Sequence, residues 1–188
     1  DMEASARLTN DFFDITCRSV MLLCLSPDYI AGKMMIVRAL LSGADLLVVT
    51  PSSLPLTTID EPIDFAAMVP AQVVESLKST MQKSRLSRIT SLIIGGAPLS
   101  PGTEVELEKL PVDMYATYGM TETVSHVALR RIGDSLSLYC ALGGISFSID
   151  ERNCLIIHAP HFSVKECVTN DVVELVDSRN FRWIGRYD

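Results

Sequence analysis

Short apolar runs alternate with helix-forming segments along the first half of the chain, and this alternation restricts the fold more than any other feature of the sequence. The runs lack a consistently polar face, which is typical of strands buried on both sides in a parallel sheet. Turn signals or helical patterns follow them, so the strands are not joined as tight hairpins. The predicted strands are Val20–Leu25, Leu46–Val49, Phe65–Val69 and Ile89–Ile94.

Helical segments fill the intervals between these runs. Met2–Ile15 has helical apolar spacing with an acidic residue in its first turn, and Ala31–Leu41 is closed by Ser42 and Gly43. A further helix is predicted from Pro70 through Met81, because its apolar residues recur every four positions. Another is predicted to begin at Ser100 and Pro101. The pattern predicts an α/β fold in which βαβ units form a parallel sheet flanked by helices.

The pattern changes near residue 130, where short β-like runs separated by turns replace the alternation. The predicted strands are Ser135–Tyr139, Ile145–Ile149, Leu155–His158, Val172–Val176 and Phe181–Ile184. We therefore expect an α/β subdomain over residues 1–130, followed by a small antiparallel, β-barrel-like subdomain over residues 131–188. No flexible Gly/Ser linker separates the two parts, so we expect them to pack closely.

Composition excludes several classes of protein. Sixteen Lys and Arg against 23 Asp and Glu give a net charge of −7 without a basic run, which disfavours nucleic-acid binding. The five cysteines form no CxxC pair, so we expect a reduced, cytoplasmic protein without structural zinc. Apolar stretches fall short of the roughly 20 residues of a membrane span. Asp1 is not a translation start, so we expect a fragment.

Two glycine-containing turns each follow an apolar run, and ligands in open α/β sheets bind outside the carboxyl ends of the strands. The first is Gly95-Gly96-Ala97-Pro98. Because its two glycines have no side chains, a flat ring could lie against the backbone. Taken alone, this segment is more simply a tight turn before a helix.

The second segment is Tyr115–Thr123, and its composition suits a nucleotide. Tyr118 offers an aromatic face, and Gly119 permits close approach of the backbone. The hydroxyl of Thr121 can donate to phosphate, and the carboxylate of Glu122 can hold a hard cation such as Mg²⁺. A polar loop with a surface glutamate explains the same composition equally well.

Tyr118–Thr123 closely resembles the signature of the adenylate-forming superfamily, which includes acyl-CoA synthetases, luciferases and peptide-synthetase adenylation domains. Three further segments occur in that superfamily's order. Gly95–Pro98 resembles its adenine-side turn, Thr169–Asp171 its ribose motif, and Gly185–Asp188 its hinge motif. The resemblance extends over essentially the whole chain and implies an acid-thiol ligase that uses ATP, Mg²⁺ and coenzyme A.

The resemblance also implies a role for each matching residue. Thr121 and Glu122 are the implied catalytic residues, and Glu122 is the implied Mg²⁺ ligand. Their chemistry fits, because a hydroxyl donor and a metal would stabilise the charge that develops on the attacked phosphate. The implied nucleotide-binding residues are Gly95, Gly96, Ala97, Pro98, Thr117, Tyr118, Gly119, Asp171 and Arg186. The implied acid-binding residues are Tyr29, Gly32 and Arg38, and Asp188 is the implied hinge.

The sequence departs from the superfamily in several places. A phosphate loop that ends in lysine normally lies upstream, and a small domain with a catalytic lysine normally follows the hinge; neither occurs in these 188 residues. Asn170 replaces a glycine, and Tyr29 stands where many relatives have histidine. We therefore interpret the chain as the later part of the large N-terminal domain, and expect it to be inactive by itself.

Leu25–Gly43 and Tyr118–His126 look most like the o-succinylbenzoate-CoA ligases of menaquinone biosynthesis. In that family an arginine at the place of Arg38 is expected to hold the substrate's second carboxylate. Taken alone, Arg38 is more simply an exposed helix residue. A synthetase for another acid and a non-catalytic nucleotide-binding module remain alternatives, and homo-oligomerisation stays open. His126, His158 and His161 are assigned to structure or to the pocket rim.

Overall fold

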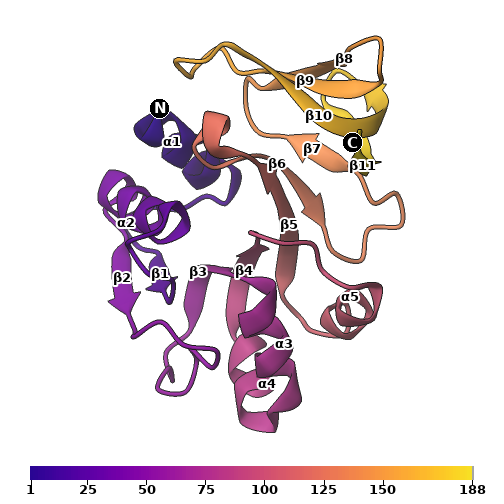
Figure 1. Cartoon of the computed structure of the whole chain (residues 1–188). Coiled ribbons are helices and arrows are strands. Elements are labelled where there is room, and N and C mark those ends of the chain that lie inside the picture. Colours follow the sequence, from indigo (N-terminus) through magenta and orange to yellow (C-terminus); the bar gives the residue numbers. More distant parts are fainter. Residues whose placement is uncertain (188) are drawn as a thin grey trace.

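The computed structural model describes residues 1–187, in which eleven strands form one sheet flanked by five α-helices (Figure 1). The strands are β1 (Val20–Leu23), β2 (Asp45–Val48), β3 (Ile63–Met68), β4 (Ile89–Ile94), β5 (Asp113–Gly119), β6 (His126–Arg131), β7 (Tyr139–Ala141), β8 (Ser146–Ile149), β9 (Cys154–His158), β10 (Glu166–Asp177) and β11 (Asn180–Arg186). The helices are α1 (Met2–Phe12), α2 (Ile30–Ser42), α3 (Pro70–Lys78), α4 (Thr80–Leu86) and α5 (Pro101–Leu107), with the 3₁₀ turn η1 at Thr121–Thr123.

The first five strands are parallel, in the order β2-β1-β3-β4-β5, and both faces of this part are covered. Alternate residues of a strand point to opposite faces. Met21 therefore joins one core with residues of α2, whereas Leu22 joins a second core with residues of α3, α4 and α5. This arrangement explains the nearly continuous apolar runs and confirms the predicted βαβ architecture.

The chain reverses direction between β5 and β6, and the remaining strands pair antiparallel in the order β6-β7-β11-β10-β9-β8. Figure 1 shows β7–β11 gathered beyond one end of the parallel strands. The core on the Met21 face continues into this half, where it includes Phe147 and Phe181. The antiparallel part thus extends the same sheet, and the predicted fold class is confirmed.

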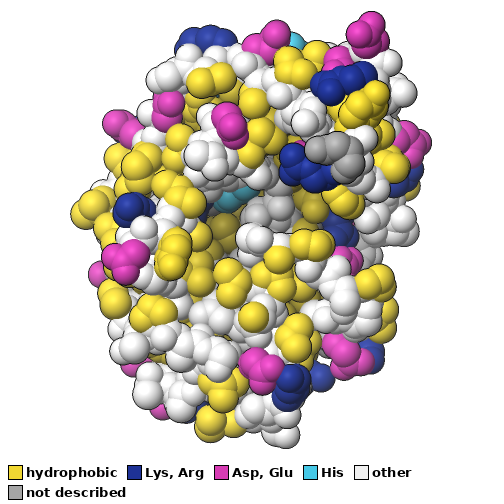
Figure 2. Space-filling view, in the orientation of Figure 1, with side chains coloured by type: hydrophobic (Ala, Val, Ile, Leu, Met, Phe, Trp, Pro, Cys, Tyr) yellow, Lys and Arg dark blue, Asp and Glu magenta, His cyan; other side chains and the backbone are white. Residues whose placement is uncertain are grey.

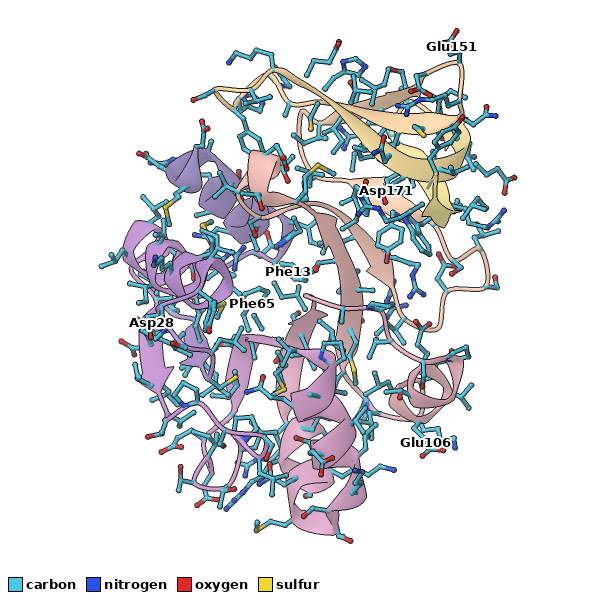
Figure 3. The ribbon with its side chains drawn as sticks, viewed as in Figure 1. Phe13, Asp28, Phe65, Glu106, Glu151 and Asp171 are labelled. Atoms are coloured by element: carbon cyan, nitrogen blue, oxygen red, sulfur yellow. The ribbon has the colours of Figure 1, made fainter. Side chains whose placement is uncertain are left out.

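Two helix predictions need correction. The first helix ends at Phe12 rather than Ile15, because Asp14 has a φ of +51°. Phe13 leaves the helix and lies beside Phe65, and both are labelled in Figure 3. Their ring centroids are 4.9 Å apart. The helix predicted from Pro70 through Met81 is two helices, because Ser79 is extended and its hydroxyl caps the second.

One strand prediction and the interpretation of one loop segment also need correction. Ser135–Tyr139 is mostly a turn, in which Ser137 has a φ of +53°, and the strand is Tyr139–Ala141. The segment Tyr115–Thr123 is not one turn, because β5 continues through Gly119 before η1 begins. Within residues 1–187, no helix combines the length and the apolar character needed to cross a membrane.

Candidate active site

A cavity of about 1100 Å³ opens where the carboxyl ends of β4 and β5 meet the antiparallel strands. Figure 2 shows a hollow on this face with hydrophobic side chains around it. Its lining comes from α1, α2, α5, η1, both halves of the sheet and the loops between them. The lining residues that the sequence predicted as site residues are Arg38, Gly95, Gly96, Ala97, Pro98, Thr117, Tyr118, Gly119 and Thr121.

At this opening, Gly95 and Gly119 leave the backbone without side chains. A Cβ atom on Gly95 would lie 2.3 Å from Thr117 Oγ1, because β4 and β5 end side by side. A Cβ atom on Gly119 would lie 2.3 Å from the carbonyl oxygen of Ser125. Both positions therefore exclude a larger residue. The strand ends present peptide groups to the cavity as the sequence predicted.

The Asp171 cluster, which we define as Tyr118, Asp171 and Trp183, lies at one end of the cavity; Tyr118 and Trp183 line it, whereas Asp171 lies outside the lining. The Tyr118 hydroxyl donates to Asp171 Oδ2 at 2.6 Å, and Trp183 Nε1 donates to Oδ1 at 3.4 Å. Burial, followed by this hydrogen bond to Asp171, raises the pKa of Tyr118. Arg186 Nη1 lies 3.9 Å from Asp171 Oδ1 but is exposed. Figure 3 shows Asp171 among the antiparallel strands.

The Arg38 cluster, which we define as Thr9, Arg38, Ser125 and His126, lies at the other end; all but the fully buried Thr9 line the cavity. Arg38 is 2% exposed, so the simpler interpretation as an exposed helix residue is wrong. Its Nη2 donates to Ser125 Oγ at 3.0 Å, and its Nη1 lies 3.7 Å from Met35 Sδ. Its Nε is buried without a hydrogen-bond partner among residues 1–187. Burial lowers the pKa of this guanidinium to about 10.

His126 lies beside Arg38 and is 6% exposed. Its Nδ1 is 3.3 Å from Ser125 Oγ, and its Nε2 is 3.3 Å from Thr9 Oγ1. Burial, and secondarily the charge of Arg38, lowers the pKa of His126 well below 6.5. The ring is therefore neutral at neutral pH. Arg38 carries the positive charge of this cluster, and the part of the chain that the structure describes places no carboxylate on it.

The turn after β5 separates its two predicted catalytic residues. Thr121 lines the cavity, whereas Glu122 is exposed and lies outside the lining. Within residues 1–187, no three His, Cys, Asp or Glu side chains are grouped as a metal site. A single carboxylate nevertheless fits Mg²⁺, which usually keeps several waters and completes its shell with substrate phosphates. Glu122 is suited to hold the ion only together with a phosphate ligand.

Five other predicted site residues lie outside the cavity lining or outside the described residues: Tyr29, Gly32, Asp171, Arg186 and Asp188. Tyr29 is 73% exposed and lies outside the lining. Gly32 is buried at the start of α2, where a Cβ atom would lie 2.2 Å from the carbonyl oxygen of Ser26. Gly32 thus allows close packing of the preceding loop, and its role toward substrate stays a prediction. Asp188, the predicted hinge, lies outside the described residues.

Sequence reasoning missed several cavity residues. Ser125 lies two residues after the nucleotide signature, but nothing in the local pattern distinguishes it from other loop serines. Trp183 precedes the predicted hinge motif, and its position as the single tryptophan was the available signal. Arg130 and Glu104 form an ion pair of 2.6 Å at the rim. Residues distant in sequence meet here, so local spacing does not reveal the contacts.

Comparisons with known proteins agree with this geometry. The sequence pattern of the AMP-binding enzyme family, described as "AMP-binding enzyme", matches residues 2–145. A 2-succinylbenzoate–CoA ligase from Enterococcus faecalis is 27% identical over 135 residues, which are 70% of this chain and 28% of that protein.

Solved structures show the same fold. The acyl-CoA synthetase (AMP-forming)/AMP-acid ligase II-like protein from Dyadobacter fermentans matches 100% of this chain and 54% of its own, with 37% identity and a TM-score of 0.92. The o-succinylbenzoate coenzyme A synthetase from Bacillus subtilis, solved with ATP and magnesium ion, matches 98% of this chain and 46% of its own, with 16% identity and a TM-score of 0.81. The chain thus spans about half the length of these two solved proteins.

Proposed function

The chain belongs to the AMP-binding enzyme family, and from this we propose that the protein is an AMP-forming acid-thiol ligase whose acid is o-succinylbenzoate. In the proposed reaction the carboxylate attacks the α-phosphate of ATP, giving an acyl-adenylate and pyrophosphate. The thiol of coenzyme A then attacks the acyl carbon and releases AMP with formation of a thioester. This would place the protein in menaquinone biosynthesis, in the cytoplasm.

Arg38 is the single observation that carries the choice of acid. A buried guanidinium without a carboxylate partner costs several kcal/mol of desolvation. Arg38 nevertheless lies in the cavity wall with Nε unpaired, although the rest of the lining is largely apolar. An acid with a second carboxylate would supply the missing partner, since a guanidinium can bind a carboxylate through two parallel hydrogen bonds. o-Succinylbenzoate combines such a carboxylate with an aromatic ring that suits the apolar walls.

The other roles divide between the two ends of the cavity. Gly95–Pro98 and the Tyr118 ring would contact adenine, while Asp171 and Arg186 would bind the ribose hydroxyls. Thr121 would donate to the phosphate. Glu122 would hold Mg²⁺, which when bound neutralises charge on the phosphates. Residues 1–130 would thus carry the acid and adenine sites, and residues 131–188 the ribose site and the hinge.

The apolar share of the lining supports one alternative, a fatty or aromatic monocarboxylic acid. Leu25, Ile30 and Ile93 contribute to it. Such a substrate would leave Arg38 unpaired. It would therefore gain nothing from the guanidinium, whereas a dicarboxylate would depend on it.

A direct assay distinguishes these possibilities. The full-length protein is incubated with ATP, Mg²⁺, coenzyme A and either o-succinylbenzoate, benzoate or octanoate, and thioesters are detected by mass spectrometry. We expect o-succinylbenzoyl-CoA to dominate, and we expect Arg38→Ala to abolish this preference. A dominant benzoyl or octanoyl product would retain the ligase and overturn the assigned acid. Nucleotide binding without any thioester would favour a non-catalytic binding module.

A further inference from the structure

We propose that Thr9, Ser125 and His126 form a one-directional hydrogen-bond relay that positions Arg38, in which His126 is held as the tautomer with its proton on Nε2. The contribution of this relay to acid recognition rests on the proposed function. Its direction rests only on the hydrogen bonds of the Arg38 cluster, including the one from Thr9 to the carbonyl oxygen of Ser5. Ser125 and His126 are positioning residues in this proposal, since they act on the acid through Arg38.

The direction follows first from the Thr9 end. Thr9 Oγ1 lies 3.2 Å from the carbonyl oxygen of Ser5, which can only accept. The single hydroxyl proton of Thr9 is therefore used in that bond. Thr9 Oγ1 must then accept from His126 Nε2, at 3.3 Å, so Nε2 carries the proton.

The Arg38 end is consistent with the same direction. A guanidinium can only donate, so Ser125 Oγ accepts from Arg38 Nη2. When Nε2 carries the single proton of the neutral ring, Nδ1 is unprotonated and accepts the hydroxyl proton of Ser125. The Thr9 end therefore sets the tautomer, and a proton on Nδ1 instead would leave Nε2 with no proton to donate to Thr9 Oγ1.

The backbone turn that carries Ser125 and His126 is conformationally strained at Val124. Val124 has a φ of +64°, a conformation that β-branched residues rarely adopt. Residues held in such conformations persist where the surrounding structure enforces them. Gly119 packs directly against the backbone of Ser125 and His126, and the amide of Ser125 donates to Thr123 O at 2.6 Å. The strained turn thus fixes the two relay residues that face Arg38.

α1 holds Arg38 from its backbone as well. Asn10 Nδ2 donates to the carbonyl oxygen of Arg38 at 2.9 Å, one residue after Thr9. Arg38 and His126 are 2% and 6% exposed, so little water is available to replace these contacts. The position of the guanidinium therefore depends on α1 and on the turn after β5 together.

A neutral relay has a chemical advantage over the usual carboxylate partner. A protein carboxylate on Arg38 would neutralise the guanidinium and compete with an anionic substrate. A protonated His126 would instead add a second buried cation and repel Arg38. Ser125 and His126 fix the orientation of Arg38 without using its charge, which leaves that charge available to a single carboxylate.

The tautomer is tested by ¹⁵N NMR on protein labelled at histidine nitrogens, at neutral pH. His126→Phe identifies the His126 signals by their loss. We expect a protonated, pyrrole-type Nε2 and an unprotonated, pyridine-type Nδ1. A proton on Nδ1, or on both nitrogens, would overturn the relay whatever the protein's activity. If His126→Phe does not fold, Thr9→Val is used, which should alter the Nε2 signal selectively.

The positioning role is tested by kinetics with o-succinylbenzoate. Ser125→Ala removes the acceptor of Arg38, so we expect KM for this acid to rise about tenfold while kcat changes less than about threefold. Ser125→Thr keeps the hydroxyl and should restore most of the affinity. His158→Phe is the matched control, since His158 also bonds a serine, Ser148, but lies outside the cavity lining.

The outcomes separate the relay from the proposed function. An unchanged KM in Ser125→Ala, with o-succinylbenzoate still activated, would overturn the positioning role and leave the function intact. Activation of other acids alone would overturn the assigned substrate, while the NMR result still decides the direction of the relay. A KM increase that Ser125→Thr reverses, together with the Nε2 tautomer, would support both parts of the inference.

Discussion

The two ends of the cavity satisfy their charged groups in different ways. In the Asp171 cluster both carboxylate oxygens already accept hydrogen bonds from Tyr118 and Trp183. In the Arg38 cluster the guanidinium has a hydroxyl and a thioether for neighbours, and its Nε has no partner within residues 1–187. A ligand at Asp171 must therefore replace or share existing bonds, whereas a ligand at Arg38 supplies a missing one.

This difference has energetic consequences. Exchanging one hydrogen bond for another changes the free energy little, typically by about 1 kcal/mol. Pairing a buried and uncompensated charge is worth more, because the desolvation cost has already been met on folding. We therefore expect selectivity for the acid to come mainly from the Arg38 cluster. The Asp171 cluster would orient its ligand with a smaller share of the binding energy.

Arg38→Met gives the largest expected effect and tests the Arg38 cluster directly. We expect kcat/KM for o-succinylbenzoate to fall about 100-fold or more, because a buried charged hydrogen bond to substrate is lost. The free energy of unfolding should rise by about 1 kcal/mol, because a methionine of similar length avoids burial of an unpaired charge. Urea unfolding and steady-state kinetics measure the two effects. Loss of stability together with loss of activity would mean that Arg38 is structural.

Gly119→Ala tests whether the turn beside the Arg38 cluster is as tight as its contacts indicate. The added Cβ would meet backbone atoms at 2.3 and 2.6 Å, which cannot rotate away. We expect the free energy of unfolding to fall by about 2–3 kcal/mol. Gly102→Ala is the matched control, since its Cβ would meet nothing within 4 Å and it lies in α5. There we expect a gain of about 0.5–1 kcal/mol.

Asp171→Asn tests the other end of the cavity, at the Asp171 cluster. The amide keeps the size of the side chain and one acceptor, but it loses the charge that would accept from two ribose hydroxyls. We expect AMP affinity to fall about tenfold, measured by calorimetry. Tyr118→Phe removes one internal bond to Asp171 and keeps the aromatic face. A change in affinity below about threefold there would agree with exchange of one bond for another; a large loss would contradict it.

The sequence predicted the elements of the site better than their contacts. The apolar run before Gly95 correctly indicated a strand, because burial on both faces leaves a local pattern, whereas β5, which ends at Gly119, was not predicted as a strand. Tyr118 and Asp171 are 53 residues apart, and Thr9 and His126 are 117 apart, so no local spacing reveals either contact. Burial of Arg38 was equally hidden, because it depends on helices and strands from both halves of the chain. The break at Ser79 was missed because apolar spacing continues across it.

The smallest predicted effect is the pH dependence that His126 gives to stability. Burial lowers the pKa of His126 well below 6.5, so the unfolded chain binds this proton first as the pH falls. The free energy of unfolding should therefore be fully retained above the ordinary pKa of 6.5 and decrease below it, by about 1 kcal/mol between pH 7 and pH 5.5. Carboxylates also titrate over this range, but His126→Phe leaves them in place. The free energy of unfolding, measured with urea at each pH, is compared between the two proteins, and the difference in its slope against pH isolates His126.

Equal slopes would mean that His126 accepts a proton beside Arg38 without penalty. The Arg38 end would then resemble the Asp171 end in tolerating a change of partner.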